Sequence, residues 1–385
     1  MGSVYAVTAF HRRVWMAMSG VVLLLGAACA TAPEAEPDVD VGARLAVRSL
    51  PEEVTFAGEV VPINEPDVRA RIEVWYNVYL SQPWRILRWM ERAQEIFPII
   101  DPILDAHGVP TDLRYLTVLE SDLNARAIGP RGERGIWQFM QGTAGDYDLR
   151  MDRFIDDRND PARSTEAAVA YFLDAAARID GPWTLRAAAF NVGISGVTDR
   201  MVRQREADYW RMVFPPATEN YVPMAIAIKL VLEEAMVKED STGLESRAQP
   251  MSRLPVSVSV SEVPIYLFDI AEHTGLSFRR LWESNPHIWQ TYLPPGEYRI
   301  YLPMSDEPGI GVSRSHLEPG RLERYLNERP YESRSYKTDG EMTVAEIADE
   351  LGIPAHELAV FNGLATGETP GEGEVLQYWA TEGSG

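Results

Sequence analysis

The spacing of apolar residues predicts helices through the middle of the chain. From Val68 to about Lys238, apolar side chains recur at helical intervals and are interrupted by loops. The candidate helices cover residues 68–79 and 83–97, a segment beginning near Thr111, and residues 165–179, 183–191 and 220–238. The last of these is apolar but contains Lys229 and two glutamates, which indicates a buried helix rather than a membrane span. We therefore expect a mainly α-helical domain over residues 66–240.

The last third of the chain contains an internal repeat. The segment that runs from Ile270 through Gly275 recurs from Ile347 through Gly352, at an offset of 77 residues. Each copy is expected to hold two short helices separated by that glycine, with one strand before them and one strand after them. The expected strands lie at residues 256–260 and 298–302 in the first copy, and at 334–337 and 375–379 in the second. This pattern predicts two small βααβ modules, over 251–305 and 333–380, joined by a linker over 306–332.

The N-terminus has the features of an export signal. His11, Arg12 and Arg13 form a basic patch, and the next 15 residues, 14–28, carry no charge. A run of this length is too short for a comfortable membrane span, which needs about 20 residues, and it suits the apolar region of a signal peptide. The run ends in small residues before Cys29, the only cysteine of the chain. The segment therefore resembles a bacterial lipoprotein signal, in which this cysteine becomes the lipidated first residue.

That resemblance has consequences for the location of the protein. It implies that residues 1–28 are a lipoprotein signal peptide and that lipid on Cys29 anchors the chain. Because Ala30 rather than Asp follows the cysteine, we expect an outer-membrane lipoprotein that faces the periplasm. The Pro- and Glu-rich segment 29–65 is then expected to be a flexible tether. An ordinary secretory signal cut near Cys29, or a short anchor, remains an alternative.

Charge and composition exclude several classes of protein. The chain carries 36 Lys and Arg against 57 Asp and Glu, a formal net charge of −21, so nucleic acid is not expected as a partner. A single cysteine excludes an intramolecular disulfide. The 6 histidines are scattered along the sequence, so we expect neither a metal site nor a cofactor.

The first candidate for chemistry is Glu120. Leu113, Leu116 and Glu120 are spaced so that they share one face of a helix, which places the carboxylate on an apolar stripe near the end of that helix. An anion in an apolar environment is costly, so the pKa of Glu120 is expected to rise, as a general acid working near neutral pH requires. In the alternative interpretation, which the spacing alone favours, Glu120 lies at the edge of the stripe, is solvated and caps the following loop.

Two segments downstream offer groups suited to a sugar. A stretch with two glycines leads into Gly135-Ile136-Trp137-Gln138-Phe139-Met140, and a later segment reads Ala189-Phe190-Asn191-Val192-Gly193. Glycine lets the backbone approach a ligand closely, aromatic faces suit sugar rings, and Gln and Asn pair donors with acceptors. For Trp137 and Phe139, plain core packing is the open alternative.

The sequence offers no obvious carboxylate partner for Glu120, and the open alternative is that one of the acids further along the chain folds back toward it. Several acids follow the glycine-containing stretch, but they lack the spacing of a calcium-binding loop. We interpret them as a solvated loop; they are Asp146, Asp148, Asp152, Asp156 and Asp157.

The order of these motifs carries a family resemblance. Glu120-Ser121, then Gly135 to Met140, then Phe190 to Gly193 resembles the lysozyme-like lytic transglycosylases, and within them the membrane-bound lytic murein transglycosylase D family. Tyr221-Val222-Pro223 also lies where the family has such a segment. The resemblance implies a mainly α, lysozyme-like (α+β) catalytic domain over 66–240, followed by two βααβ LysM-like modules, of which the first is degenerate.

The resemblance also implies an activity and a set of site residues. The family cleaves the β-1,4 bond between MurNAc and GlcNAc in peptidoglycan glycan strands and leaves 1,6-anhydro-MurNAc ends. By match, Glu120 is the single general acid and base, because the C6 hydroxyl of the substrate replaces water as nucleophile. The residues that match substrate-binding positions are Ser121, Trp137, Gln138, Phe139, Met140, Phe190 and Asn191.

The chain departs from the family pattern at several positions. Gly129 stands where the family usually has Ser, Glu133 where it has Ala, Phe190 where it has Tyr, and Ala217 where it has an acid. Gly129 and Phe190 together remove two hydroxyls near the acid or the acetamido group. The alternative function is therefore a non-catalytic peptidoglycan-binding lipoprotein with a degenerate site. No residue by itself decides between murein and chitin as the glycan, although the lipoprotein signal favours murein.

Overall fold

The computed structural model describes residues 48–242, 253–260, 264–305, 311–312 and 331–381. The expected signal peptide, the lipidation site at Cys29, the tether as far as residue 47 and most of the 306–332 linker lie outside these residues. Among the helices of the described part, none combines the length and the apolar character that a membrane crossing needs.

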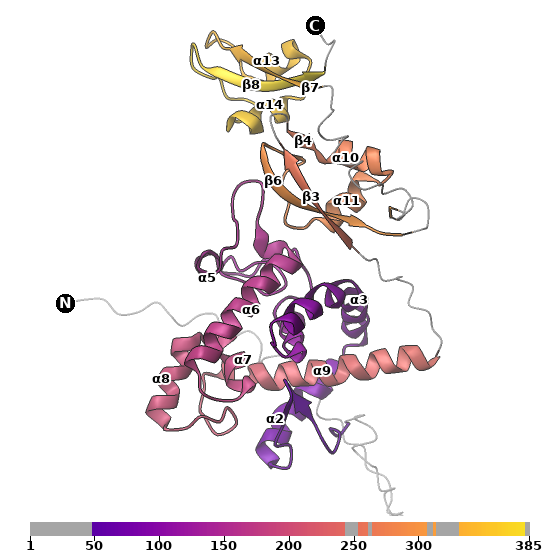
Figure 1. Ribbon diagram of the computed structural model, residues 1–385, viewed down its shortest axis with the longest axis vertical. Helices are drawn as coiled ribbons and strands as arrows, with labels where there is room; N and C mark the ends of the chain where they lie inside the picture. The colour runs from indigo at the N-terminus through magenta and orange to yellow at the C-terminus, as the bar shows by residue number, and fades with distance from the viewer. Residues whose placement is uncertain (1–47, 243–252, 261–263, 306–310, 313–330, 382–385) are drawn as a thin grey trace, which may run out of the picture. The chain divides into compact units, whose positions relative to one another are not determined.

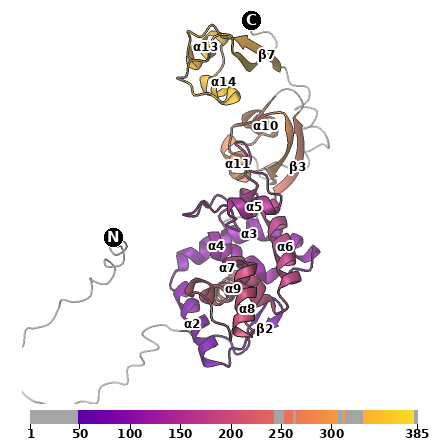
Figure 2. The same cartoon turned by 90° about the vertical axis from the view of Figure 1, so that its left-hand side faces the viewer.

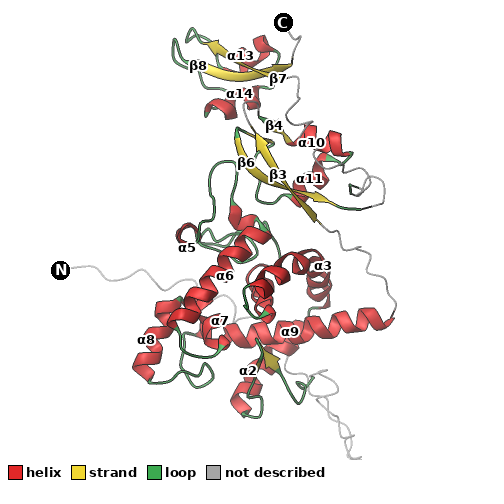
Figure 3. Ribbon diagram, viewed as in Figure 1, coloured by secondary structure: helices red, strands yellow, loops and turns green. Residues whose placement is uncertain are grey.

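The regular structure of residues 48–242 is mainly helical (Figure 3). The elements are α2 (Pro66–Leu80), α3 (Pro83–Ala106), η1 (Thr111–Arg114), α4 (Tyr115–Ser121), α5 (Gln141–Asp146), η2 (Asp157–Asn159), α6 (Pro161–Arg178), α7 (Trp183–Val192), α8 (Ile194–Gln204) and α9 (Pro216–Thr242). The long helix α9 packs against α2, α3, α4 and α7 (Figures 1 and 2). One hydrophobic core therefore joins the helices that surround it.

Helix α3 runs further than its sequence predicts. The expected helix ends at Phe97, one residue before Pro98, yet α3 continues through Pro98 and Pro102 to Ala106. A proline inside a helix removes a backbone hydrogen bond and disfavours the conformation. Ile100 and Leu104, which follow Pro98, are completely buried in the core, so packing of this last stretch outweighs the local cost.

The segment before α2 is not wholly a tether. From residue 48 onward it folds onto the helices, and a hairpin of β1 (Thr55–Phe56) and β2 (Glu59–Val60) forms within it. Its apolar side chains are buried in the core: Leu50, Val54, Phe56, Val61 and Ile63. The expectation of a flexible tether over 29–65 is wrong for residues 48–65. Most of these apolar residues lie in loops, so they follow neither a helical nor a strand period. The sequence pattern therefore did not predict their burial.

Each copy of the internal repeat has two helices and an outer pair of strands, and the first copy has a second, short pair of strands that the sequence did not predict. The first contains β3 (Arg253–Val260), β4 (Ile265–Tyr266), α10 (Leu267–Thr274), α11 (Phe278–Ser284), β5 (Tyr292–Leu293) and β6 (Gly296–Pro303); the second contains β7 (Tyr331–Lys337), α13 (Val344–Leu351), α14 (Ala355–Asn362) and β8 (Val375–Thr381). The outer strands pair antiparallel in both copies, β3 with β6 and β7 with β8. This is the expected strand order, while the LysM assignment itself stays a prediction.

Residues at equivalent positions of the two copies have the same conformation and make the same hydrogen bonds. Gly275 and Gly352 end their helices in the left-handed conformation, with φ of 71° and 67°. Asn285 donates to the carbonyls of Leu281 and Tyr301 and accepts from the Tyr301 N–H. Asn362 makes the same three bonds, to the carbonyl of Leu358 and to both backbone groups of Gln377. The side chain thus ties the second helix to the last strand in each copy.

Residues 151–160 of the helical domain bond directly to the first repeat. The backbone N–H of Asp156 donates to the His287 carbonyl, at 2.9 Å. The Tyr301 hydroxyl lies 2.8 and 3.0 Å from the two carboxylate oxygens of Asp160 and donates to that carboxylate, which is 1% exposed. Ile155 packs into the core of the first repeat. Asp160 also caps α6 by accepting from the N–H groups of Ala162 and Arg163, so one buried carboxylate serves both parts.

Candidate active site

A cleft of about 530 Å³ opens beside the end of α4. The 130–143 segment, α6 and the C-terminal end of α7 contribute its walls. The lining residues are Glu120, Pro130, Arg131, Glu133, Trp137, Gln138, Phe139, Met140, Thr143, Tyr171, Phe190, Asn191, Val192 and Gly193. The three motifs that the sequence analysis singled out therefore meet at one cavity, which is large enough for a sugar unit.

Glu120 is the second-to-last residue of α4 and is half-buried at the cleft. Burial raises the pKa of its carboxyl to about 7; the negative charge of Glu133 acts in the same direction, while a hydrogen bond from Tyr221 and the charge of Arg131 oppose it. The Tyr221 hydroxyl donates to Oε1 of Glu120 at 2.6 Å. The expectation that the apolar stripe buries this acid and raises its pKa is thus confirmed, and the solvated alternative is wrong.

The helix stops directly after this acid because the backbone turns left-handed. Asp122 and Leu123 have φ of 52° and 58°. Nε1 of Trp89 donates to the Asp122 carboxylate at 2.8 Å, and Arg85 forms an ion pair with the same carboxylate at 2.9 Å. A strained turn held by a buried indole fixes where α4 ends, and hence where the Glu120 carboxyl lies.

The 127–140 loop is shaped by a glycine that no other residue can replace. Gly135 has a φ of 75°, and a Cβ placed on it would lie 1.6 Å from the carbonyl oxygen of Arg158. Its N–H donates to the carbonyl of Ala127. Gln138, also left-handed with a φ of 50°, donates through Nε2 to the Gly135 carbonyl at 2.8 Å. The loop is therefore locked against η2, and Gln138 is held at the cleft wall.

The aromatic residues of the motifs form the inner wall of the cleft rather than a stacking platform. Trp137 is 0% exposed and its Nε1 donates to Thr165 Oγ1 at 2.8 Å, while Phe139 is 3% exposed. Phe190 stacks on Phe172 and meets Trp137 edge-on. For Trp137 and Phe139 the structure favours core packing, the alternative to the expected sugar contact. Met140, in contrast, is exposed at the cleft.

Ser121 has a structural role instead of the expected substrate contact. Its side chain is buried, and its hydroxyl approaches the carbonyls of Thr117 and Ile136 at 2.9 and 3.1 Å. These contacts join α4 to the loop of the second motif. Since the hydroxyl faces two carbonyls inside the protein, the geometry does not direct it to a ligand.

Asn191 is exposed at the cleft and is oriented by a residue that the sequence analysis did not select. Thr218, 2% exposed, donates through Oγ1 to Asn191 Oδ1 at 2.8 Å. The amide oxygen is thereby used within the protein, and the NH₂ group is the part that offers donors to a ligand. Tyr221, the donor to Glu120, was also missed as a site residue, although Tyr221-Val222-Pro223 stood out as part of the family pattern. Neither contact follows from spacing, since Tyr221 of α9 meets α4 and Thr218 of α9 meets α7 only after folding.

Glu133 is a second carboxylate in the same cleft. Its side chain is 10% exposed, and its carboxylate accepts hydrogen bonds from the Arg131 backbone N–H at 2.8 Å and from Arg131 Nε at 2.7 Å. Backbone N–H bonds, its own first, together with the Arg131 guanidinium hold the pKa of Glu133 below its ordinary value. The sequence showed no obvious carboxylate partner for Glu120, and the structure places Glu133 in the same cleft.

Gly129 and Glu133 share one space. The Gly129 N–H donates to the Glu133 carbonyl at 2.8 Å, so the two residues face each other across a turn. A Cβ placed on Gly129 would lie 2.5 Å from Glu133 Oε2 and 2.8 Å from Gln138 Oε1. The departures from the family pattern at these two positions are thus coupled, because the carboxylate occupies the room beside the glycine.

The acids between 146 and 157 divide into two groups. Asp146, Asp148 and Asp152 are exposed, as expected of a solvated loop. Asp156 is 2% exposed and pairs with the guanidinium of Arg158 at 2.7 Å, and Asp157 is also buried. For these two the expectation is wrong, because arginine and backbone donors compensate for their burial. Across the described ranges, no group of three or more His, Cys, Asp and Glu side chains is arranged to hold a metal ion.

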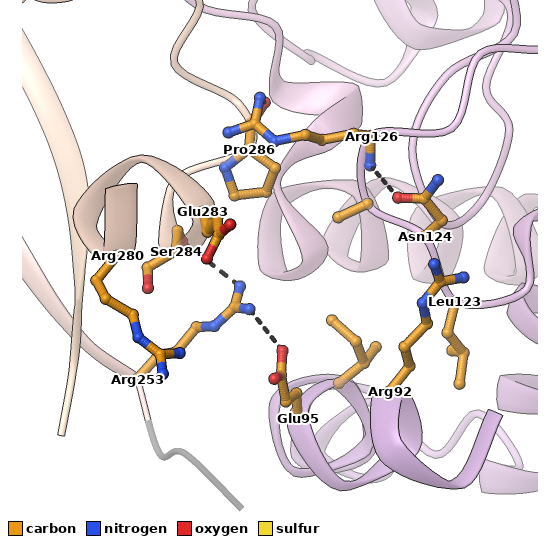
Figure 4. Close-up of a pocket in the computed structure, with 12 residues that line it drawn as sticks. Arg92, Glu95, Leu123, Asn124, Arg126, Arg253, Arg280, Glu283, Ser284 and Pro286 are labelled. Carbon is orange, nitrogen blue, oxygen red and sulfur yellow. Dashed lines mark hydrogen bonds and ion pairs between the residues drawn. The ribbon is translucent and has the colours of Figure 1, made fainter. Parts of the chain in front are cut away.

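A second cavity, of about 460 Å³, does not contain Glu120 (Figure 4). Four arginines line it: Arg92, Arg126, Arg253 and Arg280. Arg253 pairs with Glu95 at 2.8 Å, and Arg126 donates to the carbonyl of Trp282 at 2.6 Å. Much of the positive charge in this cavity therefore serves to bond α3 and the 122–126 turn to the first repeat.

Comparison with known proteins gives matches in sequence and in structure. Residues 100–213 match the family described as the transglycosylase SLT domain. The chain is 26% identical over 316 residues to the membrane-bound lytic murein transglycosylase D of Escherichia coli strain K12, over 80% of this chain and 69% of that protein. It is 29% identical over 120 residues to a protein of Alteromonas sp. strain M-1 named for tributyltin chloride resistance, over 31% of this chain and 56% of that one.

A solved structure is also similar. It is an inactive mutant of the lytic transglycosylase Slt from Pseudomonas aeruginosa, matched over 48% of this chain and 30% of that chain, with 16% identity and a TM-score of 0.28. A score this low supports no statement about the fold, so the family rests on the sequence matches. Residues 100–213 are therefore similar to the transglycosylase SLT domain, and the chain resembles the membrane-bound lytic murein transglycosylase D family, as its motifs predict.

Proposed function

We propose that this protein is a lytic transglycosylase that cleaves the β-1,4 bond between MurNAc and GlcNAc in peptidoglycan and leaves 1,6-anhydro-MurNAc ends. The observation that carries the proposal is Glu120, an acid whose pKa is raised to about 7 and which opens into a sugar-sized cleft. The SLT domain match and the similarity to a lytic murein transglycosylase support the same activity.

The first step is protonation of the glycosidic oxygen. At neutral pH a large share of Glu120 carries a proton, because its pKa lies near 7. Tyr221 donates to Oε1, so Oε2 is the oxygen left to hold the transferable proton. As the proton moves to the leaving oxygen, the bond from that oxygen to C1 of MurNAc breaks. Tyr221 then stabilises the carboxylate that forms.

The second step uses the same carboxylate as a base. The C6 hydroxyl of MurNAc attacks C1 and closes the 1,6-anhydro ring, while its proton passes to Glu120. Since the nucleophile belongs to the substrate, its effective concentration is high and no second carboxylate is needed on this route. The enzyme returns to its starting protonation state after each cycle.

The missing hydroxyls at positions 129 and 190 do not leave Glu120 without a donor. Tyr221 supplies a hydroxyl hydrogen bond to the acid, and Glu133 fills the space beside Gly129. The raised pKa of Glu120 therefore favours an enzyme over a binding protein with a degenerate site. Gln138 and the NH₂ group of Asn191 remain as polar contacts for the substrate.

Digestion of purified sacculi by the whole protein tests this function. Active protein is expected to release muropeptides that are one water lighter than products of hydrolysis. Glu120→Gln keeps the shape and removes the proton, so release is expected to fall by about 10²–10⁴-fold. Glu91→Gln, a change at an exposed position of α3, is the matched control and should digest like the unchanged protein. Equal digestion by Glu120→Gln would end the proposal.

We further propose an outer-membrane anchor through lipid on Cys29, with the domain facing the periplasm, and two LysM-like modules after that domain, of which the first is degenerate. The anchor is supported by the basic patch and the uncharged run before the cysteine. Cys29→Ala is expected to move the protein from the outer-membrane fraction to the soluble periplasmic fraction. Unchanged fractionation would argue against lipidation.

A further inference from the structure

The transglycosylase route leaves one buried acid of the cleft without a role. Glu133 lines the same cavity as Glu120, and only 10% of its side chain is exposed. An acid so enclosed in a ligand cavity is costly unless it is bonded, and here Arg131 supplies two bonds. The position is therefore built to hold a carboxylate.

Two features keep the Glu133 carboxylate in place. Arg131 donates to both oxygens, one from its backbone and one from its side chain. Gly129 leaves open the room that Oε2 occupies, since a Cβ there would lie 2.5 Å from that oxygen. Each carboxylate oxygen has two acceptor sites, so after these bonds each can still accept a proton donor such as water.

The pKa values of the two acids of the cleft are displaced in opposite directions. The pKa of Glu120 is raised by burial and by the charge of Glu133, while the pKa of Glu133 is lowered by backbone donors and by Arg131. Tyr221 on α9 and Arg131 on the loop are the other groups that act on Glu120. A protonated acid and an ionised carboxylate in one cleft are the pair with which inverting glycosidases cleave the bond and bring water to C1.

We infer that Glu133 activates a water molecule in this cleft, so that the protein also hydrolyses the bond that it cleaves as a transglycosylase. The inference takes its substrate from the proposed function. Glu120 protonates the glycosidic oxygen as its bond to C1 breaks. The water oxygen bonds to C1, and the proton that water loses passes to Glu133. The product has an ordinary reducing end, and the two carboxyls then restore their protons by exchange with solvent.

The test measures how the two products divide. Sacculi are digested with the whole protein, and the products are treated with borohydride, which reduces ordinary reducing ends and leaves 1,6-anhydro ends unchanged, before mass spectrometry. Both products are expected. In Glu133→Gln the reducing-end share should fall by about tenfold or more, while anhydro products persist. Glu91→Gln should keep the original ratio, and Glu120→Gln should lose both products.

A double variant distinguishes loss of the Glu133 carboxylate from misfolding of the loop that holds it. Gly129→Ser alone would place its Cβ 2.5 Å from Glu133 Oε2 and 2.8 Å from Gln138 Oε1. Adding Glu133→Ala removes the first of these contacts, and the second involves only the end of a flexible side chain, which can shift. This variant is expected to be active and to yield anhydro products almost alone.

Each result decides between the two ideas. Anhydro products alone from the unchanged protein, or an equal reducing-end share in Glu133→Gln, would overturn the inference and leave the transglycosylase intact. Reducing ends alone, still dependent on Glu133, would support hydrolysis and overturn the proposed function. Absence of both products would overturn both.

Discussion

The helix side of the cleft is formed by α4, α6 and α7, and α9 supports it from behind through Tyr221 and Thr218. This side and the loop side, formed by residues 129–140, position their acids by different means. Glu120 on the helix side projects from a packed helix and receives a hydroxyl bond from Tyr221. Glu133 on the loop side is bonded by its near neighbour Arg131 and fits beside Gly129. Packing raises the pKa of the first acid, and local donors lower that of the second. Two residues of the same type, a short distance apart in sequence, therefore have their pKa values displaced in opposite directions.

The largest expected effect comes from breaking the loop side at Gly135. Gly135→Ala would place a Cβ 1.6 Å from the Arg158 carbonyl, at a φ of 75°. Backbone must move to relieve that clash, so the free energy of unfolding is expected to fall by about 3 kcal/mol or more. Thermal unfolding checks the stability and sacculus digestion checks the activity, which should be lost.

Gly142→Ala is the matched control, because a Cβ on Gly142 meets no atom within 4 Å. It should unfold close to the unchanged protein. If Gly135→Ala were as stable as this control, the loop side would not depend on its glycine.

On the helix side, Tyr221→Phe is expected to slow the reaction strongly. It removes the donor to Oε1, and a bond to a charged group contributes about 1.5–3 kcal/mol, so kcat/KM should fall by about 10- to 100-fold. The bond from Tyr221 lowers the pKa of Glu120, so its loss should raise that pKa. The pH above which kcat/KM declines should therefore be higher in Tyr221→Phe than in the unchanged protein.

Glu133→Gln gives the opposite displacement and so sharpens the comparison. The charge of Glu133 raises the pKa of Glu120, and its removal should move the same limb of the pH profile to lower pH. A purely structural loss would lower the rate equally at all pH values. Displacement in the same direction for both variants would contradict the assignment of the two sides.

The pH dependence of the free energy of unfolding also distinguishes Glu120 from Glu133. The folded pKa of Glu120 is raised above that of the unfolded chain, so the folded state binds more protons and stability falls as pH rises from about 4.5 to about 7. Glu120→Gln should therefore be more stable than the unchanged protein at pH 8, by about 1–2 kcal/mol, with the gain lost below pH 4. Glu133, whose folded pKa is lowered, should show the reverse sign in Glu133→Gln.

Chemical denaturation at the two pH values measures both changes. If both substitutions changed the free energy of unfolding at pH 8 in the same direction, burial rather than local hydrogen-bond donors would determine the pKa of both acids.

The sequence predicted the helix side well and the loop side poorly, for a physical reason. Leu113 and Leu116 are fully buried, so the helical period correctly placed Glu120 on the core stripe. On the loop side, Glu133 was noticed only as a departure from a family pattern. Its place beside Gly129 depends on a turn that no period describes, and the bond across it joins groups that face each other only after folding.

Contacts between distant helices were equally hidden. Tyr221 lies about a hundred residues along the chain from Glu120, the acid to which it donates. Thr218 lies about thirty residues from Asn191, the amide that it orients. A helical period indicates which face is buried, and it does not indicate what that face meets. The fold class and the main acid were therefore predictable, while the residues that set their chemistry were not.

The smallest expected effect lies at the outer edge of the helix side. Thr218→Val removes the donor to Asn191 Oδ1 at nearly constant volume, so the exposed amide loses its fixed orientation. We expect KM for soluble glycan fragments to rise about 3- to 10-fold with kcat little changed, because one neutral bond contributes about 0.5–1.5 kcal/mol. Asn191→Ala should give at least as large a rise in KM, and the double variant should match Asn191→Ala, since the threonine acts through the asparagine. If the effects of the two substitutions on KM added instead, Thr218 would influence substrate binding by a route other than its bond to Asn191. The orientation of Asn191 would then not depend on this bond.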